Sequence, residues 1–193
     1  MIKTWAVTDT GLVRKENQDT YRIARNGDIC VVCDGMGGAA GGRLASTLAS
    51  ETYAAEMEKA LKPDMTPEQL REASAYAVAM ANRAVAERAA AEAALANMGT
   101  TLVAAVAYEN GAVITNVGDS RAYYITEAGI TRITTLWWRP WWTTVTSPLM
   151  RPAAIRGGTS SPALWAGIPT LPATGISALW SRGTLSCCAP TDW

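Results

Sequence analysis

The 193-residue sequence lacks histidine altogether, and its basic and acidic residues balance at 17 each. The resulting net charge of zero gives no electrostatic reason to expect a nucleic acid or an anionic membrane as the partner. No apolar run approaches the length of a bilayer span, and the first residues lack the apolar stretch of a secretory signal. We therefore expect a cytoplasmic protein that binds neither membranes nor nucleic acids.

Cysteine is also scarce, and two of the four cysteines, Cys30 and Cys33, form a C-x-x-C pattern. Such a pattern is typical of zinc and redox sites. No second pair of metal ligands follows it, and both residues lie in the apolar run 29–33, which predicts a buried strand. Cysteine in a buried strand packs as a small apolar side chain, so we interpret both as core residues.

The composition changes after Thr135. Seven of the eight tryptophans and seven of the nine prolines lie beyond this point, whereas lysine is absent there and Asp192 is the one acidic residue. Proline recurs too often for helices or central strands, and a low-complexity linker would be poor in tryptophan. The sequence therefore predicts no fold for residues 136–193.

A shift of the reading frame accounts for this change. When the last base of each codon is read with the first two bases of the next, Trp137-Trp138 becomes Val and Cys187-Cys188 becomes Leu. The degenerate positions permit V-V-E-T-M-V-D-N-G-D-I-T-P-D-E-A from Leu136 onward and V-L-L-C-T-D-G-L at the end. These peptides read as an acidic helix and a strand ending in Asp-Gly. We predict that residues 136–193 are an out-of-frame tail.

Residues 1–135 predict strands, then two helices, then strands again. Asn26-Gly27 is a hairpin turn signal, and Thr66-Pro67 begins the second helix with a capping box that Gln69 completes. Because helices and strands are segregated along the chain, the sequence predicts an α+β fold. Strands are expected at 3–7, 20–24, 29–33, 100–108, 112–117, 121–126 and 130–134, helices at 43–61 and 67–94, and a glycine-rich loop at 34–42.

Three aspartates lie where chemistry is expected, at strand ends beside glycine or a loop. Asp19 precedes the second strand, Asp34 ends the buried strand, and Asp119 follows Gly118. Strands can hold converging carboxylates rigidly, and oxygen ligands without histidine suit hard cations such as Mg²⁺ or Mn²⁺. Taken singly, each Asp-Gly or Gly-Asp is more typical of a turn, and Arg14 of a solvated loop side chain.

Taken together, these segments resemble the motifs of bacterial PP2C-type (PPM) metal-dependent protein serine/threonine phosphatases. The order and spacing agree over residues 1–135. The resemblance implies a four-layer αββα sandwich, of which 1–135 is the N-terminal part and the second half is missing or out of frame. The segments that carry it are 8–14, 17–19, 31–38, 42–46, 98–101 and 116–123.

The resemblance also implies the roles of individual residues. In such phosphatases two Mn²⁺ or Mg²⁺ ions activate a water that attacks phosphorus. Asp34 is then the catalytic residue that bridges the metals, with Gly35 offering its carbonyl to one of them. Asp19 belongs to the outer shell, and Asp119 to a third, weaker metal site. Arg14 binds the substrate phosphate.

Partners and activity follow from the same resemblance. Phosphorylated proteins are the expected substrates, a Ser/Thr protein kinase is the expected functional counterpart, and a monomer is expected. Ala39 and Arg43 stand where relatives often carry His and Glu, and the later Asp pair of metal ligands is absent. We therefore expect little or no activity from the chain as written. A non-catalytic phosphatase-like binding module and a non-functional frameshift product remain the alternatives.

Overall fold

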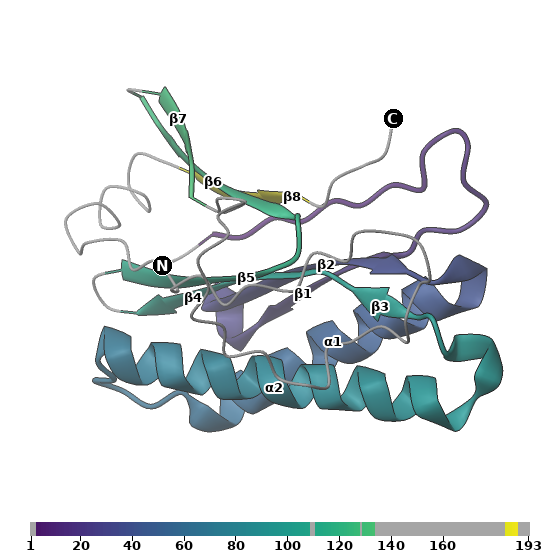
Figure 1. Cartoon of the computed structure of the whole chain (residues 1–193). Coiled ribbons are helices and arrows are strands. Elements are labelled where there is room, and N and C mark those ends of the chain that lie inside the picture. The colour runs from purple at the N-terminus through teal and green to yellow at the C-terminus, as the bar shows by residue number, and fades with distance from the viewer. Residues whose placement is uncertain (1–2, 109–110, 128, 134–183, 189–193) are drawn as a thin grey trace, which may run out of the picture.

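The computed structural model describes residues 3–108, 111–127, 129–133 and 184–188. These form three layers, with a helix pair, a five-stranded sheet and a three-stranded sheet (Figure 1). No helix in the described ranges is long and apolar enough to cross a membrane. The elements are β1 (Asp19–Ala24), η1 (Arg25–Gly27), β2 (Ile29–Met36), α1 (Gly38–Ala60), α2 (Pro67–Ala91), η2 (Ala93–Leu95), β3 (Gly99–Thr100), β4 (Leu102–Tyr108), β5 (Gly111–Val117), β6 (Arg121–Thr126), β7 (Gly129–Arg132) and β8 (Thr184–Cys188).

The five-stranded sheet is antiparallel, with the order β1-β2-β4-β5 and with β3 paired to the end of β2. The predicted turn joins β1 to β2, and Asn26 there adopts φ 55°, a left-handed conformation that asparagine tolerates. The register of this hairpin sets Asp19 opposite Asp34. The sheet therefore brings two of the predicted site residues together at one end.

Helices α1 and α2 pack side by side on one face of this sheet (Figure 1). The predicted capping box of α2 is confirmed, because Gln69 N donates to Thr66 Oγ1 at 3.2 Å and Thr66 N donates to Gln69 Oε1 at 2.9 Å. The inner face of α1 is buried at every fourth residue, which places a stripe of side chains against the sheet. That stripe consists of Ala45, Ala49, Tyr53 and Met57.

A chain of hydroxyl groups joins the two helices to the sheet within this core. The Tyr53 hydroxyl and Ser74 Oγ are 2.6 Å apart, and Ser74 Oγ lies 2.6 Å from Thr115 Oγ1. All three side chains are buried. Because each polar group has a partner, the cost of its burial is offset, and the network fixes how α1, α2 and β5 sit together.

The three-stranded sheet lies over the other face of the large sheet, in the order β7-β6-β8 (Figure 1). A second and smaller apolar cluster fills the space between the sheets, and its buried members are Val103, Ala105, Ala112, Ile114 and Ala122. The sheet face that carries this cluster thus packs mainly against β6. The loop after β5, with Gly118 and Asp119, connects the two sheets.

Two expectations about the elements were wrong. Residues 3–7 form no strand, and Trp5 and Val7 are 80% and 92% exposed. The glycine-rich loop is much shorter than 34–42, because β2 continues to Met36 and α1 begins at Gly38. Gly37 makes this tight turn at φ 121°, where a Cβ would lie 2.6 Å from Met98 Cα. Only glycine fits both the angle and the space.

Within residues 136–193, for which the sequence predicted no fold, the structure describes one strand. Thr184–Cys188 forms β8, which pairs antiparallel with β6 and sets Arg121 opposite Cys188. An edge strand offers unpaired N–H and C=O groups to any extended segment that reaches it. The pairing of β8 therefore needs no hydrophobic alternation of the kind that sequence patterns detect. The expectations for the rest of 136–193 lie outside the described residues.

Candidate functional site

The candidate site lies at the end of the large sheet, where β1 begins and β2 runs toward α1. Asp19 and Asp34 are opposed in the β1–β2 register. The charges of Asp119 and Arg14 also act on Asp34. Four residues predicted from separate sequence motifs are thus within electrostatic reach of one another. Gly35, the fifth, follows Asp34 in β2.

Asp34 is the electrostatic centre of this group. The pKa of its carboxyl is raised to about 6, first by burial and then by the carboxylates of Asp19 and Asp119, whereas the guanidinium of Arg14 lowers it. Each raising effect disfavours the ionised form of Asp34. The three carboxylates together therefore create a concentration of negative charge that a bound cation would relieve.

The backbone of Asp34 is fixed by two threonines. Asp34 N donates to Thr101 Oγ1 at 3.0 Å, Thr101 N donates to Asp34 O at 2.9 Å, and Thr100 Oγ1 donates to the same carbonyl at 2.9 Å. Thr101 Oγ1 lies 2.6 Å from Ser120 Oγ, and Ser120 is fully buried. This hydroxyl contact joins the Asp34 strand to the loop that carries Asp119. Thr100, Thr101 and Ser120 all lie in segments that carry the family resemblance, but the sequence did not predict this contact.

Gly35 lies where backbone segments approach most closely. Its N–H donates to Gln18 O at 3.2 Å, and a Cβ on Gly35 would lie 2.0 Å from Gly42 O. Gln18 Nε2 in turn donates to Gly38 O at 3.1 Å. The first turn of α1 is therefore packed directly against the site, and a side chain at position 35 would push it away.

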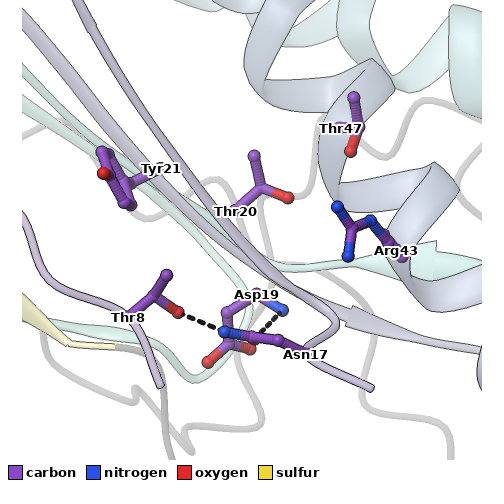
Figure 2. Close-up of a pocket in the computed structure, with 7 residues that line it drawn as sticks. All are labelled: Thr8, Asn17, Asp19, Thr20, Tyr21, Arg43 and Thr47. Carbon is purple, nitrogen blue, oxygen red and sulfur yellow. Dashed lines mark hydrogen bonds between the residues drawn. The ribbon is translucent and has the colours of Figure 1, made fainter. Parts of the chain in front are cut away.

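Two cavities flank the segment that leads into β1. The first, of about 290 Å³, is lined by Thr8, Asn17, Asp19, Thr20, Tyr21, Arg43 and Thr47 (Figure 2). The second, of about 280 Å³, is lined by Arg14, Lys15, Glu16 and Gln18. The predicted phosphate-binding Arg14 thus lies in a cavity next to the carboxylates. The first cavity was not predicted from the sequence, because its lining comes from segments far apart in the chain.

The donor groups fit a hard cation in kind, because Asp34 is flanked by other carboxylates whose repulsion a cation would relieve. These donor groups are too few to complete a cation site. Among the described residues, no group of three or more His, Cys, Asp or Glu side chains could hold a metal ion. The described residues therefore do not by themselves form a complete cation site.

The C-x-x-C pattern is not part of the site. Cys33 is buried in β2, and burial raises the pKa of its thiol to about 12. Burial likewise raises the pKa of Cys30. Both thiols are free and protonated at neutral pH. Cys33 is a core residue, as the sequence indicated, whereas Cys30 is only partly buried.

The order of these features along the chain matches a known family. A family model described as protein phosphatase 2C matches residues 13–137. The chain belongs to the protein phosphatase 2C family. The predicted family and its α+β sandwich are thereby confirmed, and the second helix layer of the sandwich has no counterpart among the described residues.

Relatives of this protein phosphatase 2C chain include serine/threonine phosphatase stp of Listeria monocytogenes, which is 36% identical over 121 residues, covering 61% of this chain and 48% of the relative. The crystal structure of Stp1 from Staphylococcus aureus is similar with a TM-score of 0.62 at 32% identity, over 69% of this chain and 53% of that one. The catalytic domain of PstP in complex with two manganese ions is similar with a TM-score of 0.56 at 32% identity, over 65% of this chain and 52% of that one. The chain spans about half the length of these relatives.

Proposed function

We propose that this phosphatase 2C sequence serves the hydrolysis of phosphoserine and phosphothreonine in proteins, with Mn²⁺ or Mg²⁺ as the cofactor. One observation carries the proposal: Asp34 lies at a sheet end under the combined charge of Asp19, Asp119 and Arg14. Carboxylates suit a divalent cation in kind, and an adjacent guanidinium suits a phosphate. The relatives named as serine/threonine phosphatases, and the manganese ions of PstP, support the same reading.

Each residue has a distinct part in this proposal. Asp34 would hold metal through its carboxylate and Gly35 through its carbonyl, while Asp19 would act in the outer shell and Asp119 would serve a further, weaker site. Bound metal supplies charge neutralisation on the phosphoryl oxygens and a water of lowered pKa. Arg14 binds the phosphate of the substrate, by two parallel N–H···O bonds where its planar guanidinium faces two oxygens.

We also propose that residues 1–135 are the N-terminal part of the phosphatase domain and that 136–193 are read out of frame. The remaining metal ligands would then lie in the hidden frame, which permits a strand ending in Asp-Gly. A site with only Asp34 and Gly35 as inner ligands holds metal weakly. The chain as written is therefore expected to have almost no turnover.

The test compares the chain as written with a chain from the same gene whose reading frame is restored after Thr135. Phosphate release from a phosphothreonine peptide is measured with Mn²⁺ and with a chelator. The restored chain should turn over with Mn²⁺, and Asp34→Asn should abolish that turnover, whereas Asp64→Asn, at an exposed turn between the helices, should leave it intact. An inactive restored chain that folds would contradict the proposal.

A second candidate is a non-catalytic module that binds phosphoproteins. It is favoured by the lack of a complete metal-ligand group in the described ranges, together with two cavities that each carry an arginine. It predicts that a phosphopeptide binds without Mn²⁺-dependent phosphate release, even after the frame is restored. Calorimetric titration beside the phosphate assay separates this module from the enzyme.

The wider setting follows from the chemistry of the reaction. A phosphatase acts on groups that a kinase installs, so we propose a Ser/Thr protein kinase as the functional counterpart. We further propose a monomer located in the cytoplasm, where protein phosphorylation of this kind takes place. Sedimentation and cell fractionation test these two points.

A further inference from the structure

The cavity beside β1 is lined by polar side chains from three parts of the chain. Thr8 comes from the N-terminal segment, and Asn17 and Asp19 lead into β1. Arg43 and Thr47 lie one turn apart on the same face of α1, as residues four apart do. Of these five, only Asp19 has a part in the proposed phosphatase chemistry. The cavity thus presents a second polar surface next to the first.

Arg43 is the cationic group of this cavity. Its guanidinium points into the space between Thr47 and Asn17 (Figure 2). In the part of the chain that the structure describes, Arg43 has no ion-pair partner. Several other arginines do have one, namely Arg22 with Glu51, Arg71 with Glu68, Arg83 with Glu87 and Arg88 with Glu92. The donors of Arg43 are therefore open to a ligand.

The hydroxyl groups of the cavity add further donors. Thr8 Oγ1 accepts from Asn17 Nδ2 at 2.7 Å, so its own hydrogen is left to donate. Asn17 Oδ1 already accepts from Asp19 N at 2.9 Å. Asp19 is the one acidic residue in the lining. The charged donors of Arg43 and the threonine hydroxyls of the lining suit a ligand group with several oxygens and a negative charge.

The two cavities are neighbours across a single stretch of chain. Asn17 and Asp19 line one of them and Gln18 the other, as alternating side chains of an extended segment do. Arg14 lines the second cavity and also acts on Asp34. A phosphate held at Arg14 would therefore have the rest of its peptide within reach of Arg43.

We propose that Arg43 forms a second anion subsite, which selects phosphopeptides with another oxyanion, a carboxylate or a second phosphate, close to the phosphorylated residue. The proposal rests on the proposed function for the position of the first phosphate. It adds a preference that the metal site alone would not give. Arg43 is a specificity-determining residue in this account, since it contacts a part of the substrate that does not react.

The experiment measures peptide binding to the metal-free chain by fluorescence anisotropy at one low ionic strength. The probes are three labelled phosphothreonine peptides that differ at one position, two residues from the phosphothreonine. This position carries alanine in the first peptide, glutamate in the second and phosphoserine in the third. The wild type should bind the last two about threefold to tenfold more tightly than the alanine peptide. Arg43→Ala should remove this gain and leave the affinity for the alanine peptide unchanged. Comparing glutamate with phosphoserine shows which oxyanion is preferred.

Arg83→Ala is the matched control, because Arg83 is an exposed helix arginine already paired with Glu87. The Arg83→Ala variant should still bind the glutamate and phosphoserine peptides more tightly than the alanine peptide. Equal affinities in the wild type, or a gain that survives Arg43→Ala, would overturn the proposal. If the alanine peptide does not bind at all, the proposed phosphate site at Arg14 fails instead. Inorganic phosphate is then titrated against the Arg43 side-chain N–H signal by NMR, where a saturable shift supports the subsite and no shift overturns it.

Discussion

At the scale of single residues, the ionised carboxyl of Asp34 suits the proposed metal but destabilises the metal-free fold. Its pKa of about 6 in the folded chain exceeds the value of about 3.9 for an unperturbed aspartate. A raised pKa contributes stability below about pH 4, which is lost as the pH rises through about 6. Because the carboxyl is partly exposed, solvent screening reduces the loss to about 1 kcal/mol. Asp34→Asn should therefore stabilise the metal-free chain by about this amount at pH 7.5 and not at pH 4, as measured by urea denaturation with a chelator.

The control for this effect is Asp64→Asn, since Asp64 lies exposed in the turn before α2. It should change the free energy of unfolding little at either pH. A destabilised Asp34→Asn at pH 7.5 would mean that the Asp34 carboxylate forms favourable contacts that outweigh its repulsion from Asp19 and Asp119.

The hydroxyl link between Thr101 and Ser120 gives a second prediction at this scale. Thr101→Val keeps the shape of the side chain but removes the acceptor for Asp34 N and the partner of Ser120. We expect a loss of about 1–3 kcal/mol, because buried polar groups are left without partners. Thr101→Ser keeps the hydroxyl and should recover most of the stability. Amide hydrogen exchange at Asp34 reports the broken bond directly, and unchanged exchange in Thr101→Val would contradict this role.

At the scale of elements, the junction between β2 and α1 depends on Gly37. A Cβ there would meet Met98 Cα at 2.6 Å with φ at 121°, whereas Gly38 has φ 80° and open space within 4 Å. Gly37→Ala should cost about 2–3 kcal/mol from strain and contact together, and Gly38→Ala about 1 kcal/mol from backbone strain alone. Urea denaturation of the Gly37→Ala and Gly38→Ala variants separates the cost of the Met98 contact from the cost of backbone strain. Equal losses would show that the Met98 contact relaxes freely.

This junction also shows what local patterns cannot predict. The capping box at Thr66 and Gln69 was predicted, because all its partners lie within one turn. The start of α1 at Gly38 was not, since glycine is a poor helix former and the backbone at Met98, far away in sequence, leaves no room for a side chain at Gly37. Residues 3–7 have a strand pattern, but a pattern carries no information on whether a pairing partner is present.

At the scale of the whole molecule, the sequence predicted the family and the α+β fold, which are confirmed, whereas the roles of the site residues stay predictions. Asp19, Asp34 and Asp119 stand in motifs whose order marks the family, and the sheet register and electrostatics bring them together. The Arg43 cavity was beyond prediction, because it forms only where the N-terminal segment, β1 and α1 meet. The pairing of β8 with β6 depends likewise on an open sheet edge, which appears only after the strands are assembled.

The central claim is that Asp34 anchors a divalent metal in a ligand set that the chain as written does not complete. Mn²⁺ affinity, measured by electron paramagnetic resonance in the chain as written, in the frame-restored chain and in their Asp34→Asn variants, tests it most directly. We expect weak Mn²⁺ binding in the chain as written, binding at least about tenfold tighter in the frame-restored chain, and loss of binding in both Asp34→Asn variants. Mn²⁺ binding that is unchanged by Asp34→Asn would contradict it.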